Sequence, residues 1–367
     1  MKFDCYMPVK VISGKDCVKK NASLFSGRGK NCLIVTGGTS AVRSGAFDDC
    51  IAALTAENIT YTVFDKITAN PYCDTCYEAG EFARKNNADF IIGIGGGSVL
   101  DASKAVAIYA SNPDMSIEGI YSRVIPAKAL PVFLIGTTAG TGSEVTGVSV
   151  LTHRQTGRKK SISGADCYAM ISFCDYTYTK TVPSYGTFST ALDAFAHAVE
   201  SLLNSTANEL VYSYSGKAIA LLKDYILRPD IPEKLSEEER EKLYTASIFA
   251  GLSINIAGCG FPHTVGYYLT ENYNVPHGAA CAAFMPLFLD NAKKYCPDKL
   301  GTIENILGVD HAELSAIIKS KLKFDFTISA DEAEKVALRW KDGVKNFNRS
   351  PGGFDYMQAA EALKSFN

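Results

Sequence analysis

One stretch joins a strand pattern to a glycine-rich turn: Asp89-Phe90-Ile91-Ile92-Gly93-Ile94-Gly95-Gly96-Gly97-Ser98. Its first half is a short apolar run, which is typical of a strand buried on both faces of a parallel sheet. A helical pattern follows from Val99 to Ala110. Bare backbone N–H groups at the start of such a helix attract a phosphate. The stretch therefore predicts a phosphate-binding turn, with a plain tight turn as the alternative.

Two details of this turn add expectations. The dinucleotide fingerprint is met only in part, because Ser98 stands where its third glycine belongs. Ser98 and Asp101 have the spacing of a capping box, so we expect them to fix the helix start. A second loop of glycines and hydroxyls, Gly136 to Glu144, follows the next predicted strand at 132–136. Loops at the carboxyl ends of neighbouring parallel strands share one crevice, so the two loops together favour a nucleotide site.

The second half of the chain contains a set of metal-binding side chains. Asp193 and His197 are four residues apart in the apolar run 191–199, so on a helix they share one face. His263 and His277 follow in the same half. One carboxylate and three imidazoles suit a divalent first-row ion that keeps a position for a substrate oxygen. The alternative is that each of these side chains satisfies its own hydrogen bond in the core.

The pattern of predicted elements changes along the chain. Apolar strands at 32–36, 60–64, 89–94 and 132–136 alternate with helical patterns, which indicates a parallel sheet with both faces covered. Beyond residue 185 only helical patterns are expected, at 187–203, 207–225, 236–257, 279–295, 301–307, 311–322, 330–345 and 354–365. We therefore predict an α/β dinucleotide-binding domain over 1–184 and an all-helical metal-binding domain over 185–367. A cleft between two domains is a usual place for chemistry.

Composition excludes several classes of protein. The 367 residues carry a net charge of −2, whereas nucleic-acid or anionic-membrane surfaces need a basic excess. The apolar runs are strand-sized and the first residues lack the order of a signal peptide, so a cytoplasmic protein is expected. Eleven cysteines suit free thiols in a reducing compartment. We interpret Cys73 and Cys76, which have CxxC spacing, as a helix start.

In the order and spacing of four blocks, the chain resembles the iron-dependent (group III) alcohol dehydrogenase family. The blocks are Gly95 to Ala105, Thr137 to Thr146, Asp193 to Glu200, and His263 through Pro276-His277-Gly278, and the similarity covers nearly the whole chain. The resemblance implies an α/β, Rossmann-like N-terminal domain with a parallel sheet and an all-α C-terminal domain. This is the dehydroquinate synthase-like, or iron alcohol dehydrogenase, fold.

The resemblance also implies the roles of individual residues. It assigns the metal ligands to Asp193, His197, His263 and His277. For the cofactor it places the pyrophosphate at the glycine turn, with Asn70 beside the nucleotide and Lys159 near the ribose. The cofactor-binding residues so expected are Gly96, Gly97, Ser98, Thr137, Thr138, Thr141, Asn70 and Lys159.

Two positions depart from the pattern of the family. Several members carry a further histidine four residues after the third ligand, where this chain has Tyr267, a candidate catalytic residue whose phenol has an ordinary pKa near 10. Relatives that prefer NAD have an aspartate after the first strand, where this chain has Gly37, in the segment Gly37, Gly38, Thr39 and Ser40. Without that carboxylate, hydroxyls and Arg43 can receive a 2′-phosphate, so we hypothesise a preference for NADP(H) over NAD(H).

The resulting hypothesis is a metal-dependent alcohol dehydrogenase or aldehyde reductase. It would transfer a hydride between NAD(P)(H) and a short-chain primary alcohol or aldehyde, with Fe(II) favoured by resemblance and Zn(II) as the other ion that the ligands suit. One alternative is a zinc-dependent polyol dehydrogenase of the same superfamily. Another is a nucleotide-binding protein without catalysis. The expected partners are a small-molecule substrate and further copies of the chain, as a homodimer or larger homo-oligomer.

Overall fold

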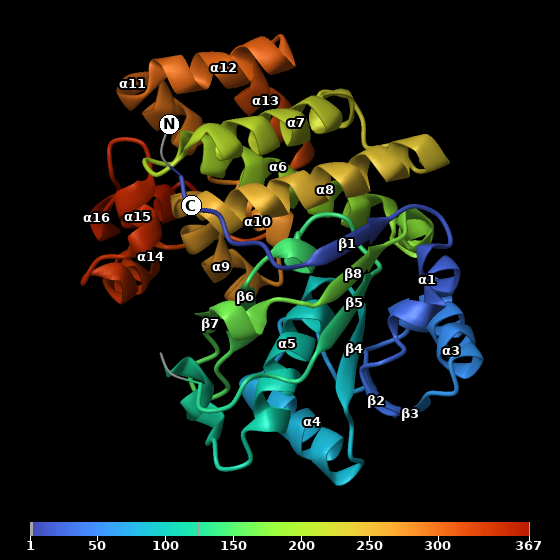
Figure 1. Ribbon diagram of the computed structural model, residues 1–367. Coiled ribbons are helices and arrows are strands. Elements are labelled where there is room, and N and C mark those ends of the chain that lie inside the picture. Colours follow the sequence, from blue (N-terminus) through green and yellow to red (C-terminus); the bar gives the residue numbers. More distant parts are fainter. Residues whose placement is uncertain (1–2, 123–124, 367) are drawn as a thin grey trace. The chain divides into compact units, whose positions relative to one another are not determined.

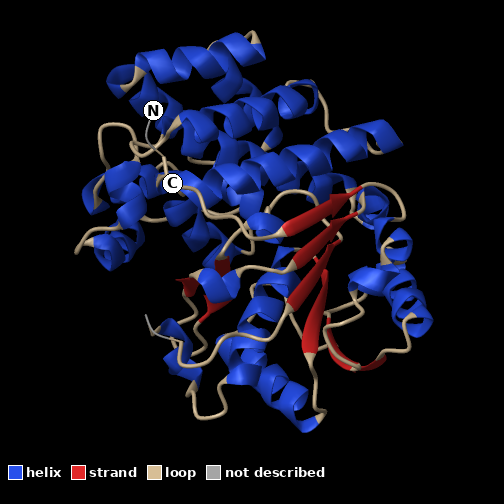
Figure 2. Ribbon diagram, in the orientation of Figure 1, coloured by secondary structure: helices blue, strands red, loops and turns tan. Residues whose placement is uncertain are grey.

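A computed structural model describes residues 3–122 and 125–366, and within them the chain divides into two compact units (Figure 1). The first unit consists of Tyr6–Pro183 and the short segment Leu235–Tyr244. The second contains Ser184–Lys234 and the residues from Thr245 on. Figure 2 shows that the described strands all belong to the first unit and that the second is helical. A parallel-sheet domain and an all-α part were both expected, and the fold class is confirmed.

The first unit alternates strands and helices. Its main sheet contains β1 (Lys10–Ser13), β2 (Asn31–Val35), β3 (Thr60–Phe64), β4 (Phe90–Gly95), β5 (Val132–Gly136) and β8 (Ile171–Cys174). Its helices are α1 (Cys17–Lys20), α2 (Ser40–Arg43), α3 (Ala46–Ala56), α4 (Cys73–Lys85) and α5 (Gly97–Ser111). A separate antiparallel hairpin joins β6 (Val148–Thr152) to β7 (Lys159–Ser163).

The six strands of the main sheet are parallel and lie in the order β1-β8-β5-β4-β2-β3. From β2 the chain passes outward to β3 and then returns to β4 on the other side of β2. The strand order therefore reverses between β2 and β4, and ligands of open α/β sheets bind at such a switch point, beyond the carboxyl ends of the strands. The loops after β2 and β4 flank this point.

The central strands β2, β4, β5 and β8 are buried on both faces, as the continuous apolar runs predicted. Alternate residues of β2 divide between two cores: Leu33 and Val35 pack with α4 and α5, whereas Cys32 and Ile34 pack with α1 and α3. Figure 1 shows the two pairs of helices on opposite faces of the sheet. Cys73 and Cys76 are buried in the first turn of α4, as expected for a helix start.

The second unit is built around α6 (Ser184–Leu203), which is buried on all sides from Ala191 to Leu203. The remaining helices are α7 (Glu209–Ile226), α8 (Glu237–Ala257), α9 (Phe261–Tyr273), α10 (His277–Ala282), α11 (Met285–Tyr295), α12 (Pro297–Leu307), α13 (His311–Lys321), α14 (Ala330–Ala337), α15 (Lys345–Arg349) and α16 (Tyr356–Lys364). The first two turns of α8 belong to the α/β unit and the rest of this helix to the helical unit.

Several elements differ from the predictions. The helix α9 was not predicted, and neither were β1, β8 and the hairpin of β6 and β7. The helix predicted over 330–345 is shorter: α14 passes into a 3₁₀ turn at Leu338–Trp340, and a left-handed turn at Gly343 separates this turn from α15, which begins at Lys345. The domain boundary expected between residues 184 and 185 stays a prediction.

No described helix, taken singly, is both long and apolar enough to span a bilayer. The helices α8 and α9 reach that length and composition only as a pair, and they are bent by 112° where they meet.

Candidate metal centre and nucleotide-binding edge

The four predicted metal ligands lie together in the helical unit. The Oδ1 atom of Asp193, in α6, is 3.3 Å from Nε2 of His263, 3.7 Å from Nε2 of His277 and 3.8 Å from Nε2 of His197. The imidazoles of His197 and His263 are stacked, with ring centroids 4.5 Å apart. One carboxylate oxygen thus faces three imidazole nitrogens from three helices.

Close backbone packing brings the last of these helices to α6. A Cβ atom on Gly278, in α10, would lie 1.8 Å from the backbone oxygen of Ser189 and 2.8 Å from the backbone nitrogen of Asp193. Only glycine permits this approach. The backbone N–H of Ala279 also donates to Oγ of Ser189, at 3.2 Å. The residue after His277 therefore fixes that imidazole beside Asp193.

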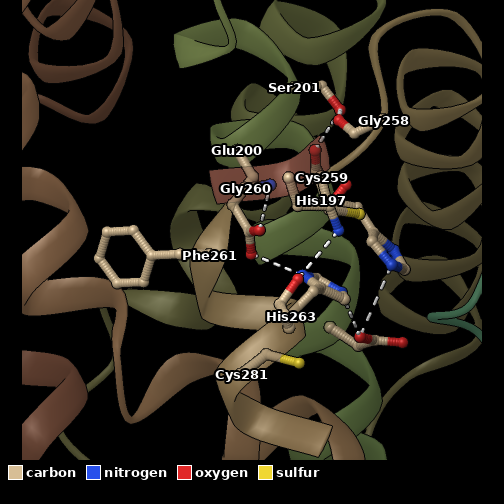
Figure 3. Close-up of polar contacts among 12 residues, drawn as sticks. His197, Glu200, Ser201, Gly258, Cys259, Gly260, Phe261, His263 and Cys281 are labelled. Carbon is tan, nitrogen blue, oxygen red and sulfur yellow. Dashed lines mark hydrogen bonds and ion pairs between the residues drawn. The ribbon is translucent and has the colours of Figure 1, made fainter. Parts of the chain in front are cut away.

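A second carboxylate, that of Glu200, orients His263. Its Oε1 accepts a hydrogen bond from Nδ1 of His263 at 2.6 Å, and its Oε2 accepts one from the backbone N–H of Gly260 at 2.7 Å (Figure 3). Glu200 is fully buried. Since Gly260 is the residue before α9, the same carboxylate satisfies an N–H group at the start of that helix. A proton on Nδ1 leaves the Nε2 lone pair of His263 directed at the cluster, as metal-binding histidines require.

The charges in the cluster depend on one another. Burial raises the pKa of Asp193, but the imidazoles of His197 and His277 outweigh it and hold the pKa below its ordinary value. Burial lowers the pKa of His263, whereas the negative groups around it, Glu200 among them, hold it well above its ordinary value. Asp193 is thus a carboxylate at neutral pH, and positive charge is favoured around it.

The cluster passes a test for a divalent ion. Oδ1 of Asp193 and Nε2 of His263 are buried and lie 3.3 Å apart, but within residues 3–122 and 125–366 neither makes a hydrogen bond of good geometry. Buried polar atoms without a hydrogen bond are costly, and an ion between them would satisfy both. An oxygen and three nitrogens also match the preferences of Fe(II) and Zn(II). The residues present therefore fit a metal ion.

Three further side chains border the cluster. The ring of Tyr267, one turn after His263, stacks on His277 with centroids 5.3 Å apart, and burial raises the pKa of its phenol. The thiol of Cys281 is 3.8 Å from Nε2 of His277. The thiol of Cys259 lies within 4.8 Å of ligand atoms of His197 and His263. The sequence prediction named Tyr267 and missed both thiols and Glu200.

The nucleotide-binding features predicted for the α/β unit lie at one edge of its sheet. Val35 is level with Gly93, and Gly95 with Gly136, so three loops leave the sheet together after β2, β4 and β5. At the start of α5, Gly96 lies beside Thr138, and a Cβ on Gly97 would be 2.5 Å from Cγ2 of Thr141. The second loop therefore packs directly on the glycine turn.

The start of α5 differs from the expected capping box. The cap residue is Gly96, and no side chain caps this helix start in the described structure. Asp101 instead accepts hydrogen bonds from Oγ of Ser143 (2.5 Å) and from the backbone N–H of Val150 (2.9 Å). The capping-box prediction is wrong because Asp101 binds the following loop and strand. The N–H groups of the glycine turn remain suited to a phosphate.

Asn70 and Lys159 are connected to this edge. The backbone N–H of Asn70 donates to Oγ of Ser98 at 3.2 Å, and Oγ1 of Thr152 donates to the backbone oxygen of Asn70 at 3.0 Å. Thr152 is in turn the strand partner of Lys159. The next residue, Lys160, places its ammonium group 4.0 Å from the ring centroid of Tyr121, so the two lysines occupy opposite faces of the hairpin.

The loop after β2 and the loop after β5 complete the predicted set. Gly37 forms an isolated backbone bridge with Lys66, and the next three residues, Gly38 to Ser40, are exposed. Thr137 follows β5 directly, and its backbone N–H donates to the backbone oxygen of Gly95 at 2.9 Å. The hydroxyl of Thr137 is buried and has no hydrogen-bond partner in the part of the chain that is described.

A buried lysine behind the glycine turn was not predicted. Nζ of Lys104, in α5, donates to Oγ of Ser143 (2.8 Å) and to the backbone oxygens of Thr146 (3.0 Å) and Val148 (2.7 Å). Burial lowers the pKa of this ammonium group. Near it, Glu144 is buried and accepts a hydrogen bond from the phenol of Tyr244 at 2.9 Å, and burial raises the pKa of that carboxyl. These contacts fasten the loop after β5 to the helix that carries the turn.

Comparison with known proteins agrees with this arrangement. The sequence profile described as "Iron-containing alcohol dehydrogenase" matches residues 8–176, and the profile of the C-terminal part of that family matches 187–328. The 1,3-propanediol dehydrogenase of Citrobacter freundii is 32% identical over 344 residues, which are 92% of this chain and 86% of that protein.

Solved structures extend the similarity to the whole fold. An iron-containing alcohol dehydrogenase from Thermotoga maritima superposes with a TM-score of 0.91 at 31% identity, covering 99% of both chains. A sulfoacetaldehyde reductase from Bifidobacterium kashiwanohense, solved in complex with NAD⁺, gives 0.88 at 27% identity and full coverage of both. The predicted family and enzyme class are confirmed. The two profiles together span most of the sequence, and the solved relatives share its complete fold. The chain therefore belongs to the iron-containing alcohol dehydrogenase family.

Proposed function

We propose that this alcohol dehydrogenase catalyses reversible hydride transfer between a nicotinamide cofactor and a short-chain primary alcohol or its aldehyde, with a divalent ion in the Asp193 cluster. One observation carries the proposal. Three imidazole Nε2 atoms lie 3.3 to 3.8 Å from a single buried carboxylate oxygen, Oδ1 of Asp193. Such a convergence of donors is costly unless a cation satisfies them.

Asp193, His197, His263 and His277 would hold the ion, with Fe(II) favoured by the family and Zn(II) compatible with the same donors. When bound, the ion would polarise the carbonyl oxygen of an aldehyde or lower the pKa of an alcohol. Glu200 would keep His263 in the tautomer that coordinates, because it accepts the Nδ1 proton. Burial of the carboxylates excludes water and strengthens these interactions.

Tyr267 would act as a hydrogen-bond donor at the edge of this site. Burial raises the pKa of its phenol, so the group keeps its proton at neutral pH. A neutral phenol donates to a substrate oxygen but does not serve as a general base under these conditions. Replacing Tyr267 by Phe separates the two roles: we expect lower turnover without a shift in the pH optimum.

The glycine turn would bind the pyrophosphate of the cofactor through backbone N–H groups of Gly97 and Ser98 at the start of α5. The hydroxyls of Thr138 and Thr141 lie beside Gly96 and Gly97, and Asn70 is fixed by Ser98. These groups would orient the nucleotide, and the nicotinamide would supply or accept the hydride. Lys159 would approach the ribose from the hairpin of β6 and β7.

For the choice of cofactor we propose a preference for NADP(H). The segment Gly37 to Ser40 has no carboxylate to repel a 2′-phosphate, and Arg43 is exposed in the short helix that follows. The NAD⁺ complex of the sulfoacetaldehyde reductase argues for the other choice. Initial rates of aldehyde reduction with NADPH and NADH at equal concentration decide between them, and a large NADH advantage would reverse the assignment.

The function itself is tested by elemental analysis of anaerobically purified protein combined with a panel of aldehydes and both cofactors. We expect one divalent ion for each chain and turnover of short primary aldehydes. Turnover confined to polyols, with zinc bound, would instead support the polyol dehydrogenase alternative. Bound nucleotide without any turnover would support a binding protein.

We further propose a cytoplasmic protein with no nucleic-acid or membrane partner, based on the net charge of −2 and on eleven free cysteines, ten of them partly or fully buried. We propose a homo-oligomer from the family resemblance, since relatives are commonly dimers or larger. Size-exclusion chromatography with light scattering tests the oligomer, and a monomer at working concentration would contradict it.

A further inference from the structure

The metal cluster contains a thiol that the Asp/His₃ ligand set does not use. Cys281 follows His277 by one turn of α10 and is completely buried. Its sulfur lies 3.7 Å from Nδ1 and 3.8 Å from Nε2 of His277. One ligand atom from each of Asp193, His263, His277 and Cys281 lies within 4.8 Å of all the others. The thiol is therefore part of the cluster.

The spacing of the oxygen and nitrogen atoms in this group is close to that around a four-coordinate ion. In a tetrahedral zinc site, two nitrogen or oxygen ligands are about 3.3 Å apart, and a sulfur is about 3.6 Å from a nitrogen. Here Oδ1 of Asp193 is 3.3 Å from Nε2 of His263 and 3.7 Å from Nε2 of His277. The Cys281 sulfur is nearly equidistant from Nδ1 (3.7 Å) and Nε2 (3.8 Å) of His277, so it lies beside the ring in this structure. Coordination therefore requires the thiol to turn about its Cα–Cβ bond toward the ion, within a group of atoms that already lie within 4.8 Å of one another.

We infer that Cys281 is a metal ligand for thiophilic ions, so that the centre has a second ligand set, Asp193, His263, His277 and Cys281, which binds Zn(II). The inference rests on the proposed metal centre and adds a ligand that decides which ion the centre prefers. His197 is then a ligand for harder ions such as Fe(II), or a fifth donor. On binding, the thiol proton passes to solvent and the thiolate bonds to the ion, with no change of oxidation state.

A second thiol provides a matched control. Cys259 precedes α9 and lies near ligand atoms of His197 and His263 only, so its group has three members instead of four. It is also less buried than Cys281. Figure 3 shows the two cysteines above and below His263 in this view. Removing either thiol deletes one sulfur beside the same imidazole, but only Cys281 belongs to a complete set.

The experiment uses Co(II) as a spectroscopic substitute for Zn(II). Metal-free full-length protein is titrated with Co(II), and thiolate coordination is detected as an intense near-ultraviolet charge-transfer band that nitrogen and oxygen ligands do not give. We expect the band in the wild type and in Cys259→Ser, and its loss in Cys281→Ser. Cys281→Ala provides a second variant, and circular dichroism of each metal-free protein checks that it is folded.

Each outcome is decisive. Stoichiometric Co(II) binding without the band in the wild type overturns the inference and leaves the Asp/His₃ centre intact. A band that disappears in Cys259→Ser but persists in both Cys281 variants also overturns it. Absence of Co(II) binding in every protein contradicts the proposed metal centre itself, and with it the inference.

A competition measurement adds a second readout. Thiolates favour Zn(II) over Fe(II), so removing a thiolate ligand should weaken Zn(II) more than Fe(II). We expect the ratio of Zn(II) to Fe(II) affinity to fall by about tenfold or more in Cys281→Ser, and to stay unchanged in Cys259→Ser. An equal ratio in all three proteins would show that Cys281 is not a ligand.

Discussion

The proposed metal cluster and the proposed nucleotide-binding edge would hold their ligands by different means. In the cluster, every candidate donor is a side chain, and those of Asp193 and His263 are almost fully buried. At the nucleotide edge, the donors are backbone N–H groups at the start of α5. Gly96 and Gly97 have no side chain, so the neighbouring loop can approach the turn closely. The first region depends on which side chain is present at each position. The second depends on how closely two loops can approach each other.

This difference predicts two kinds of defect. Losing Asp193, His263 or His277 should remove the ion and lower turnover, because these three residues belong to both proposed ligand sets. Disturbing the nucleotide edge should weaken cofactor binding. The ion should stay in place, since its ligands are side chains of the helical unit.

The largest effect is expected for His263→Ala. Loss of a ligand should exceed the roughly 10- to 100-fold effect of losing a group that only orients one, so turnover should fall by more than about 100-fold. Metal content should fall with it, and circular dichroism should show a folded protein. The matched control is His311→Ala, because His311, at the start of α13, is half-buried and pairs with Glu304 of α12 at 3.0 Å. Full activity in metal-free His263→Ala would remove the cluster from the mechanism.

Glu200→Gln tests the orientation of His263. The amide oxygen can still accept the Nδ1 proton, but the amide N–H₂ then faces the backbone N–H of Gly260, and the negative charge is lost. We expect metal affinity to fall by about 10- to 100-fold. Ser215→Ala is the control, since it removes a buried hydrogen bond to Ser253 and should cost about 1 kcal/mol of stability without changing metal affinity. Metal affinity equal to that of the wild type would show that Glu200 is only structural.

Gly97→Ala tests the nucleotide edge. The added Cβ would lie 2.5 Å from Cγ2 of Thr141, so the turn and the second loop must separate. The KM for the cofactor should rise by about tenfold, a loss of about 1.4 kcal/mol, while metal content stays the same. Adding Thr141→Ser removes Cγ2 and should restore part of the affinity.

The control for this variant is Gly301→Ala, where an added Cβ has open space in α12. It should stabilise the protein by about 0.4 to 1 kcal/mol and leave both ligands unaffected. A cofactor KM within twofold of the wild type in Gly97→Ala would mean that the nucleotide does not bind at this turn.

The smallest effect concerns pH. Burial raises the pKa of Glu144 above its ordinary value of 4.5, so the folded state binds the proton more tightly than the unfolded state. Stability should therefore fall as pH rises from about 4.5 through the higher folded pKa. Glu144→Gln lacks this ionisation, and Gln still accepts from Tyr244. The difference in unfolding temperature, variant minus wild type, should be larger at pH 8 than at pH 5. A difference that does not change with pH would show that Glu144 has no raised pKa.

The α/β unit was predictable because its signals are local. The strands 60–64 and 132–136 were predicted with their observed bounds. The second is an apolar run that ends at a turn and is buried throughout, whereas the first is a β-branched and aromatic run at the edge of the sheet and is only partly buried. The start of α8 was also predictable, because Ser236 and Glu239 form a local capping pair: the backbone N–H of Glu239 donates to Oγ of Ser236 at 3.2 Å. The capping box at Ser98 failed because the partner of Asp101 lies more than 40 residues away, at Ser143.

The candidate site was predictable for its ligands and not for the groups around them. The helix α9 was missed because Gly260, Pro262 and Gly266 interrupt its pattern, although the helix is buried and stabilised by tertiary contacts. Glu200 had a usable signal, since it is seven residues after Asp193 and so lies on the same helix face. Cys281 had one too, four residues after His277. Neither spacing predicts which side chain of another helix Glu200 or Cys281 contacts.

Glu200 binds two things at once, the imidazole of His263 and the first N–H group of the helix that carries it. Replacing Glu200 to change the ion preference of the centre would therefore have two effects. It would change the orientation of the His263 imidazole, and it would leave the N–H group of Gly260 at the start of α9 without its acceptor. A redesign needs a new cap for α9 together with the new residue.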